Sequence, residues 1–304
     1  MSSQGLKIVW GAAGVRSDSA YGTQEQFDQI AKVLKAGGCD TLDTATLYGE
    51  SEKLLSEFGA NKEFTIDTKA VGGFNEKGTS DKETIIANGE ASQKFFGKHL
   101  ETLEGVNEIY KRGFFKRFGL SNFKVEDVQK AYDICKAKGY PLPSVYQGNY
   151  NPVARLQEDD LFPLLRKLNM SFYVYSPLAG GFLTKTKQDI QDGKGRFDPS
   201  NYIGEMYSGL YARPTLLESL AEWESIAKEE GIPRAELAYR WVNYNSPLNA
   251  KYGDAIIFGA SSVQQAEQTL AGLKKGPLSD KAVKRIDAIW QNIKHEAPRD
   301  NLHK

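Results

Sequence analysis

Three side chains that can move a proton lie at the ends of two successive apolar segments. Asp43 and Tyr48 lie at the end of the first segment, and Lys69 ends the second. Because the carboxyl ends of parallel strands meet at one edge of a sheet, we expect these side chains to share one site. The carboxylate would keep the lysine charged, and the ammonium would lower the pKa of the phenol from its usual value of about 10. Such a phenol can protonate a carbonyl oxygen while a hydride attacks the carbonyl carbon.

Each of the three residues also has a plain structural interpretation. Asp43 could cap the loop that follows it, Lys69 could reach along the strand to solvent, and Tyr48 could be a core aromatic. The spacing of the three residues favours the shared site over these separate roles. Tyr48 is followed by Gly49, which favours an exposed turn at the end of the strand.

The composition gives no reason to expect a macromolecular partner. The 304 residues include 39 basic and 39 acidic side chains, and this balance does not favour nucleic acid or an anionic membrane. No apolar run reaches the ~18 residues needed to span a bilayer, and the N-terminus lacks a signal-peptide pattern. Cys39 and Cys135 have no metal-binding or redox spacing. We therefore expect one cytoplasmic domain over residues 1–304, with no metal site.

Short β-branched segments alternate with amphipathic ones, which indicates repeated βα units around a parallel sheet. The segment 184–213 is predicted to be irregular and is long enough to cover a ligand. The predicted strands are residues 8–10, 41–43, 64–69, 118–120, 144–147, 172–175 and 255–258. The predicted helices run from Thr23 to Gly37, near 124–138, 159–168, 216–229, 233–243 and 263–273, and from Ser279 onward.

Seven strands are one fewer than a closed (β/α)8 barrel needs. The missing strand would fall between Lys69 and Phe118. There the sequence predicts a polar loop over 72–81 followed by helices at 82–98 and 101–112.

Nearly the whole chain resembles the aldo-keto reductases, and in particular their aflatoxin-aldehyde-reductase-like branch with its fungal members. The resemblance implies an α/β fold, a (β/α)8 TIM barrel that binds NADP(H) in an extended pose. It also implies reduction of an aldehyde or ketone to an alcohol. The six matching segments come in the family's order, each at a predicted strand end: Leu42–Gly49, Thr68–Lys69, Gly119–Asn122, Tyr146–Asn151, Tyr175–Gly181 and Gly259–Ser262.

The resemblance also assigns roles to individual residues. Asp43, Tyr48 and Lys69 match three of the four catalytic positions, and Arg196 is expected to contact a phosphate, which suits a guanidinium. The other matching residues would hold the nicotinamide carboxamide (Ser121, Asn122, Gln147), stack on its ring (Tyr175), approach the pyrophosphate (Ser176, Leu178, Gly180) or hold the adenosine end (Gly259, Ser261, Ser262, Gln265, Gln268). Core packing for Tyr175 and helix capping for Ser261 and Ser262 are the structural alternatives.

The fourth catalytic position departs from the family pattern. Relatives carry a catalytic His at the end of strand four, whereas His99 is the only histidine in that interval and begins a predicted helix. The interval is also shorter by roughly a dozen residues. We therefore expect strand four to be shortened, replaced or absent and its His to be missing, at a cost on the order of 10²–10³ in rate. Closer approach of its neighbours, recruitment of 93–100, or a homodimer could repair the barrel, and a skipped piece of the gene is the remaining explanation.

Three functions are consistent with these observations. The first is an NADP(H)-dependent reductase of a small carbonyl compound, weakened by the missing His and working in secondary metabolism or carbonyl detoxification. The second is a pocket redirected to a non-redox lyase, isomerase or cyclase step. The third is a non-catalytic NADP(H)-binding protein.

Overall fold

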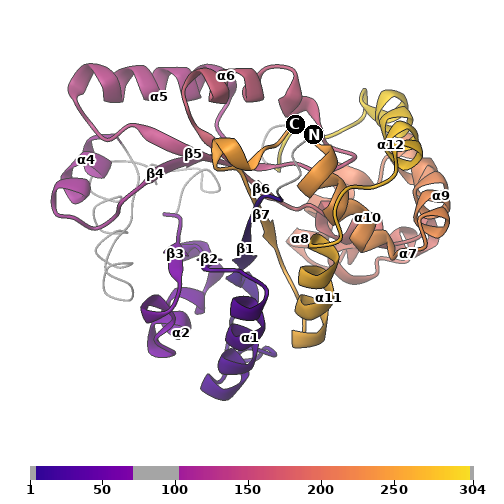
Figure 1. Cartoon of the computed structure of the whole chain (residues 1–304), viewed down its shortest axis with the longest axis horizontal. Coiled ribbons are helices and arrows are strands. Elements are labelled where there is room, and N and C mark those ends of the chain that lie inside the picture. The colour runs from indigo at the N-terminus through magenta and orange to yellow at the C-terminus, as the bar shows by residue number, and fades with distance from the viewer. Residues whose placement is uncertain (1–4, 71–102, 302–304) are drawn as a thin grey trace.

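The strands of the protein form one curled parallel sheet, in a computed structural model that describes residues 5–70 and 103–301 (Figure 1). In spatial order the described strands are β3, β2, β1, β7, β6, β5 and β4. This is the order of a half-barrel within the (β/α)8 fold, so the predicted fold class is confirmed. The strands are β1 (Lys7–Gly11), β2 (Thr41–Asp43), β3 (Thr65–Asp67), β4 (Phe118–Ser121), β5 (Pro143–Asn149), β6 (Ser171–Tyr175) and β7 (Ala255–Phe258).

The seven described strands coincide with the seven that the sequence predicts. The predicted loop at 72–81, the helix at 82–98, the strand fragment within 93–100 and His99 all lie outside the described residues. The helix predicted at 101–112 is confirmed as α4 (Leu103–Lys111).

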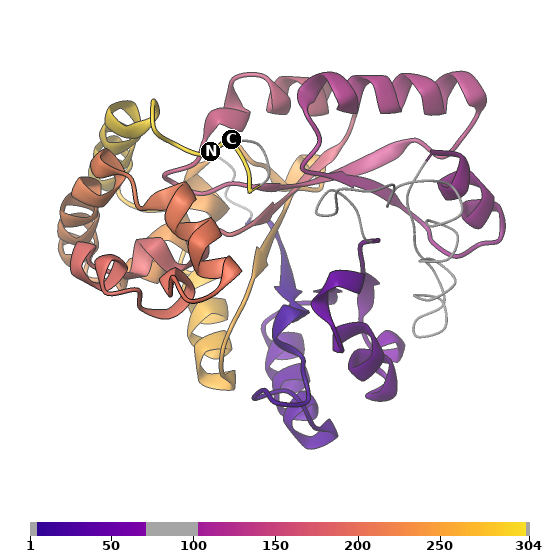
Figure 2. The same ribbon diagram turned by 180° about the vertical axis from the view of Figure 1, so that it is seen from behind.

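Helices form the outer layer around this sheet, as the two opposite views show (Figures 1 and 2). None of them, within the described part of the chain, has the length and apolar character to span a membrane. Besides α4 they are α1 (Gln24–Ala36), α2 (Ser51–Glu57), α5 (Val125–Lys138), α6 (Leu161–Lys167), α7 (Lys187–Gln191), α8 (Tyr202–Tyr211), α9 (Pro214–Glu229), α10 (Arg234–Arg240), α11 (Val263–Leu273) and α12 (Asp280–Ile293).

The structure corrects the sequence-based prediction in three places. The segment 184–213 contains α7 and α8, although it was predicted to be irregular. The α8 helix has glycine and aromatic residues that form helices weakly, and its capping by the Asn201 side chain compensates. The prediction omitted α2, which is only seven residues long. The helix predicted at 233–243 ends earlier, because a π-turn over Trp241–Asn245 follows α10.

The apolar core has two parts on opposite faces of the sheet. The larger part lies between the sheet and the helices and includes Leu42, Phe172 and Trp223. The smaller part fills the interior of the curled sheet and consists of Val9, Tyr173, Ala255 and Ile257, with Val145 and Tyr175 packed against it. Alternation along each strand separates the two sets, so the interior-facing positions can be read from the register.

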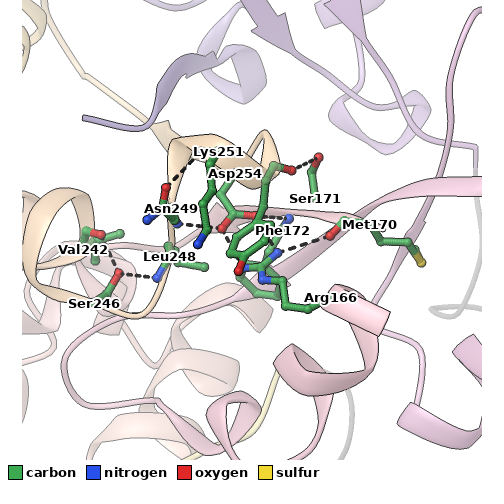
Figure 3. A network of polar contacts seen from close by, with 11 residues as sticks. Arg166, Met170, Ser171, Phe172, Val242, Ser246, Leu248, Asn249, Lys251 and Asp254 are labelled. Carbon is green, nitrogen blue, oxygen red and sulfur yellow. Dashed lines mark hydrogen bonds and ion pairs between the residues drawn. The ribbon is translucent and has the colours of Figure 1, made fainter. Parts of the chain in front are cut away.

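An ion pair between Arg166 and Asp254 joins α6 to the beginning of β7 (Figure 3). Asp254 is fully buried and accepts two hydrogen bonds from the Arg166 guanidinium, at 2.9 and 2.6 Å. It also accepts from the backbone N–H groups of Phe172 and Asn249, both at 2.8 Å. The guanidinium lies 4.3 Å from the centre of the Tyr252 ring. Four donors therefore satisfy one carboxylate at the amino-terminal end of the strands.

Candidate active site

The ends of β2 and β3 bring Asp43, Tyr48 and Lys69 together. The Lys69 ammonium donates to both oxygens of Asp43 at 2.8 Å and to the carbonyl of Thr44 at 2.7 Å. The same nitrogen lies 5.4 Å from the centre of the Tyr48 ring. The parallel ladder continues past β3, with bonds from Thr44 N to Asp67 O and from Thr46 N to Lys69 O. This extension holds Lys69 in place against the end of β2.

The charges around Lys69 keep it protonated. Burial lowers the pKa of Lys69, but the Asp43 carboxylate, the Tyr48 phenol and Asp67 together outweigh burial, and the net pKa is raised. The side chain is still 24% exposed, so solvent reaches it from the cavity. The lysine is therefore an ammonium at neutral pH, fixed by three hydrogen bonds.

The phenol of Tyr48 does not follow the sequence-based expectation. The Lys69 ammonium pulls the pKa of Tyr48 down, but burial, the Asp43 carboxylate and the Tyr207 hydroxyl outweigh it. The net pKa is raised, so the expectation of a lowered value is wrong for the protein alone. Burial depends on the folded surroundings and cannot be judged from spacing in the sequence. A raised pKa keeps Tyr48 protonated at neutral pH, which is the form that can donate a proton.

Gln147 makes a contact that sequence reasoning missed. Its amide nitrogen donates to Asp43 at 2.7 Å, across the interior of the sheet from β5 to β2. The resemblance assigns Gln147 to the cofactor carboxamide, and nothing in the sequence links it to a residue 104 positions away. Asp43 is therefore held by Lys69 and Gln147 together.

One large cavity, of about 1640 Å³, begins at these three residues and runs along the strand ends. Fifteen of the sixteen predicted site residues line it; Ser262 does not, and instead caps α11 by accepting from Gln265 N. Sequence reasoning missed a further set of cavity residues. Leu47 and Phe123 lie within or next to matched segments but are apolar and have no assigned role, whereas Tyr207, Glu236, Tyr239 and Lys275 lie where the sequence carries no motif.

The backbone along this cavity adopts the left-handed conformation at several positions. Asn122, Ser176 and Ala179 have φ values of 58°, 52° and 53°, and Gly180 and Gly181 follow with 68° and 99°. Non-glycine residues rarely adopt this region, and such positions collect at binding sites. Tyr175 stabilises the turn at Asn122, because its hydroxyl donates to the Asn122 side chain at 2.7 Å. The cavity wall is thus set by the fold itself.

Substitution of Gly180 by Ala is expected to weaken the binding of a ligand in this cavity by at least about tenfold. A Cβ atom at Gly180 would lie 2.2 Å from the Tyr207 ring, and φ is +68° there. The ring would have to move, and its hydroxyl would lose contact with Ser176 Oγ at 3.2 Å. Fluorescence titration with NADPH, the cofactor that the sequence resemblance implies, measures the effect. Gly209→Ala is the matched control, since a Cβ atom there meets nothing within 4 Å; equal affinity in both variants would contradict the expectation.

Within the described residues, no group of His, Cys, Asp or Glu side chains is placed to hold a metal ion. The polar groups of the cavity are an acid–amine–phenol set at one end and amides and hydroxyls along its length, together with the cations Arg196, Lys124 and Lys275 and the carboxylates Asp127 and Glu236. The set at one end can transfer a proton, and the remainder suits a long, polar, anionic ligand.

The family model for the aldo/keto reductases matches residues 7–291. The chain belongs to this family. The aldo/keto reductase described here is 37% identical over 298 residues to "Oxidoreductase sirO" of Leptosphaeria maculans, covering 92% of this chain and 90% of that relative. It is 34% identical over 300 residues to "Aldo-keto reductase family 7 member A3" of Homo sapiens, covering 88% and 90% of the two chains. It is 32% identical over 323 residues to "Aflatoxin B1 aldehyde reductase member 2" of Rattus norvegicus, covering 94% and 88%.

The family resemblance inferred from six short motifs is therefore confirmed for this aldo/keto reductase. The match begins at the start of β1 and ends within α12, so it includes every described strand. The family name supports oxidoreductase chemistry on a carbonyl group.

Proposed function

We propose that this aldo/keto reductase uses NADPH to reduce an aldehyde or ketone to an alcohol. The observation that carries the proposal is the Lys69 ammonium, bound by Asp43 and Thr44 beside the Tyr48 phenol, at one end of a single long cavity. A proton donor at the end of a dinucleotide-sized cavity is the arrangement that carbonyl reduction needs.

The cavity residues fit NADP(H). Gly180 and Gly181 have positive φ, which lets a phosphate approach the backbone closely. Arg196 lines the same cavity and has no carboxylate partner among the described residues; its guanidinium instead lies 3.5 Å from the Tyr207 hydroxyl. We assign the pyrophosphate to this region, the nicotinamide to the side of Gln147 and Tyr175, and the adenosine end to Gln265 and Gln268.

The protein's own residues would supply the proton and stabilise the group that loses it. When bound, the cofactor supplies the hydride. The Tyr48 hydroxyl donates its proton to the carbonyl oxygen as negative charge develops there. The Lys69 ammonium stabilises the resulting phenolate, and Asp43 and Gln147 keep the ammonium in place. Positioned general-acid catalysis of this kind contributes typically about 10²–10⁴ in rate.

Two apolar side chains of the cavity suggest the kind of substrate. Leu47 and Phe123 line the cavity and are 47% and 38% exposed, so both apolar side chains are available to a ligand. We propose an apolar or aromatic carbonyl compound as the substrate. The name of one relative, an aflatoxin B1 aldehyde reductase, supports an aldehyde as the carbonyl compound, and we propose a role in secondary metabolism or carbonyl detoxification.

The test is a titration with NADPH followed by a turnover assay. We expect saturable quenching of the tryptophan fluorescence by NADPH, weaker quenching by NADH, and consumption of NADPH with aromatic aldehydes. Product formed without consumption of NADPH would favour the lyase, isomerase or cyclase alternative. Binding of NADPH without turnover on any carbonyl would favour the non-catalytic alternative. Absence of binding would overturn both the reductase proposal and the non-catalytic NADP(H)-binding alternative.

A further inference from the structure

A second carboxyl group lies beside the proton-transfer residues, and the mechanism above does not use it. Asp67 ends β3 and is in register with Asp43 on β2. Residues in register on neighbouring strands point to the same face of a sheet. Thr68 confirms the orientation, because its hydroxyl bonds Glu52 of α2 on the outer side. Asp67 and Lys69, on either side of Thr68, therefore face the interior.

The groups that face Asp67 come from four parts of the sheet. Among the described residues, Asp43 on β2 repels the Asp67 carboxylate, whereas Lys69 after β3, Lys7 on β1 and Arg117 before β4 attract it. The Lys69 ammonium directs its three hydrogen bonds to Asp43 and Thr44. No described side chain or backbone group donates a hydrogen bond to the Asp67 carboxyl, so among the described residues it is coupled to these groups through charge.

Asp67 is thereby able to change its charge near neutral pH. Burial raises the pKa of Asp67 most, and the Asp43 carboxylate raises it further. The three cations oppose this, and the resulting pKa is about 6. Above that pH two carboxylates flank the Lys69 ammonium, and below it only Asp43 remains charged.

We propose that Asp67 is a positioning residue of the proton-transfer set, acting through Lys69 on the acidity of Tyr48. The inference rests on the proposed function. When Asp67 is ionised, two negative charges share one ammonium, and the ammonium stabilises the Tyr48 phenolate less. When Asp67 takes up a proton from solvent, that second negative charge disappears and Tyr48 becomes the stronger acid. The rate of reduction therefore rises as the pH falls through the titration of Asp67.

The pH profile of kcat tests this inference. In the unmodified protein kcat is expected to rise roughly two- to fivefold as the pH falls from about 8 to about 5, the effect of one unit charge in a partly solvated site. The side chain of Asp67→Asn carries no charge at any pH. The rise in kcat toward low pH, which is the acidic limb of the profile, should therefore be missing from this variant, and its kcat should keep the faster value throughout. Asp67→Glu should restore the limb. Asp133→Asn, on the exposed face of α5, is the matched control and should retain it. An unchanged limb in Asp67→Asn would overturn the inference.

A second measurement does not depend on turnover. Carbon-13 NMR of protein labelled at the aspartate carboxyls should show one resonance that titrates with a midpoint of about 6 and is missing in Asp67→Asn. Absence of such a resonance from the unmodified protein overturns the inference even where the variant does not fold. Full activity in Tyr48→Phe would instead overturn the proposed role of Tyr48 as the proton donor. Loss of activity in Tyr48→Phe together with an unchanged limb in Asp67→Asn would overturn only the role of Asp67.

Discussion

Replacement of Tyr48 by Phe is expected to lower kcat for carbonyl reduction by about 10²–10⁴. The substitution removes the hydroxyl that donates the proton and keeps the ring that lies 5.4 Å from the Lys69 nitrogen. Only proton transfer should suffer, so the dissociation constant for NADPH should change by less than about threefold. The consumption of NADPH with an aromatic aldehyde measures the rate, and fluorescence quenching measures binding.

The control for this experiment is Tyr110→Phe. Tyr110 lies on α4, is exposed and does not line the cavity, so its replacement should leave both rate and affinity unchanged. If Tyr48→Phe kept the full rate, the proton would have to come from another group, and the mechanism proposed here would be excluded.

Replacement of Asp254 by Ala is expected to lower the free energy of unfolding by about 3–5 kcal/mol. The fully buried carboxylate accepts bonds from Arg166, Phe172 N and Asn249 N (Figure 3). Its removal takes their acceptor from the two backbone N–H groups and leaves the Arg166 guanidinium with only the Met170 carbonyl. Urea unfolding at neutral pH, followed by circular dichroism, measures the effect. The dependence on denaturant should be unchanged, because the surface exposed on unfolding is the same.

Asp160→Ala is the matched control for Asp254→Ala. Asp160 also pairs with an arginine, Arg299, but both side chains are partly exposed to solvent. An exposed pair contributes about 0–1 kcal/mol, so this variant should remain close to the unmodified protein. Losses of similar size in the two variants would show that burial of Asp254 does not determine its contribution.

The sequence predicts the sheet better than the helices over the cavity. Short β-branched runs such as Ala255–Phe258 are visible because a strand buried on both faces is apolar throughout. The α8 helix was missed because its residues form helices weakly and its stability comes from tertiary contacts, such as those of Tyr207 and Tyr211 with Phe197 and Phe182. Tyr207, which lies on that helix, was missed for the same reason.

The candidate site was predictable where the fold alone sets positions. Strand ends meet in any parallel barrel, so Asp43 and Lys69 could be paired from their places in the sequence. Two other features depend on distances that no motif records. One is the bond from Gln147 to Asp43, which crosses the interior, and the other is the burial that raises the pKa values of Tyr48 and Asp67. These are properties of the assembled interior rather than of any single segment.

The Arg166–Asp254 network and the proton-transfer residues occupy opposite ends of the sheet. Asp254 precedes β7, whereas Asp43 and Lys69 follow the ends of β2 and β3. Because the stabilising ion pair lies at the amino-terminal end of the strands, the loops at the carboxyl-terminal end can change in sequence without disturbing it. Substitution of Leu47 or Phe123 should therefore alter which molecules this enzyme accepts while its melting temperature stays nearly constant, which makes the scaffold a suitable starting point for directed evolution.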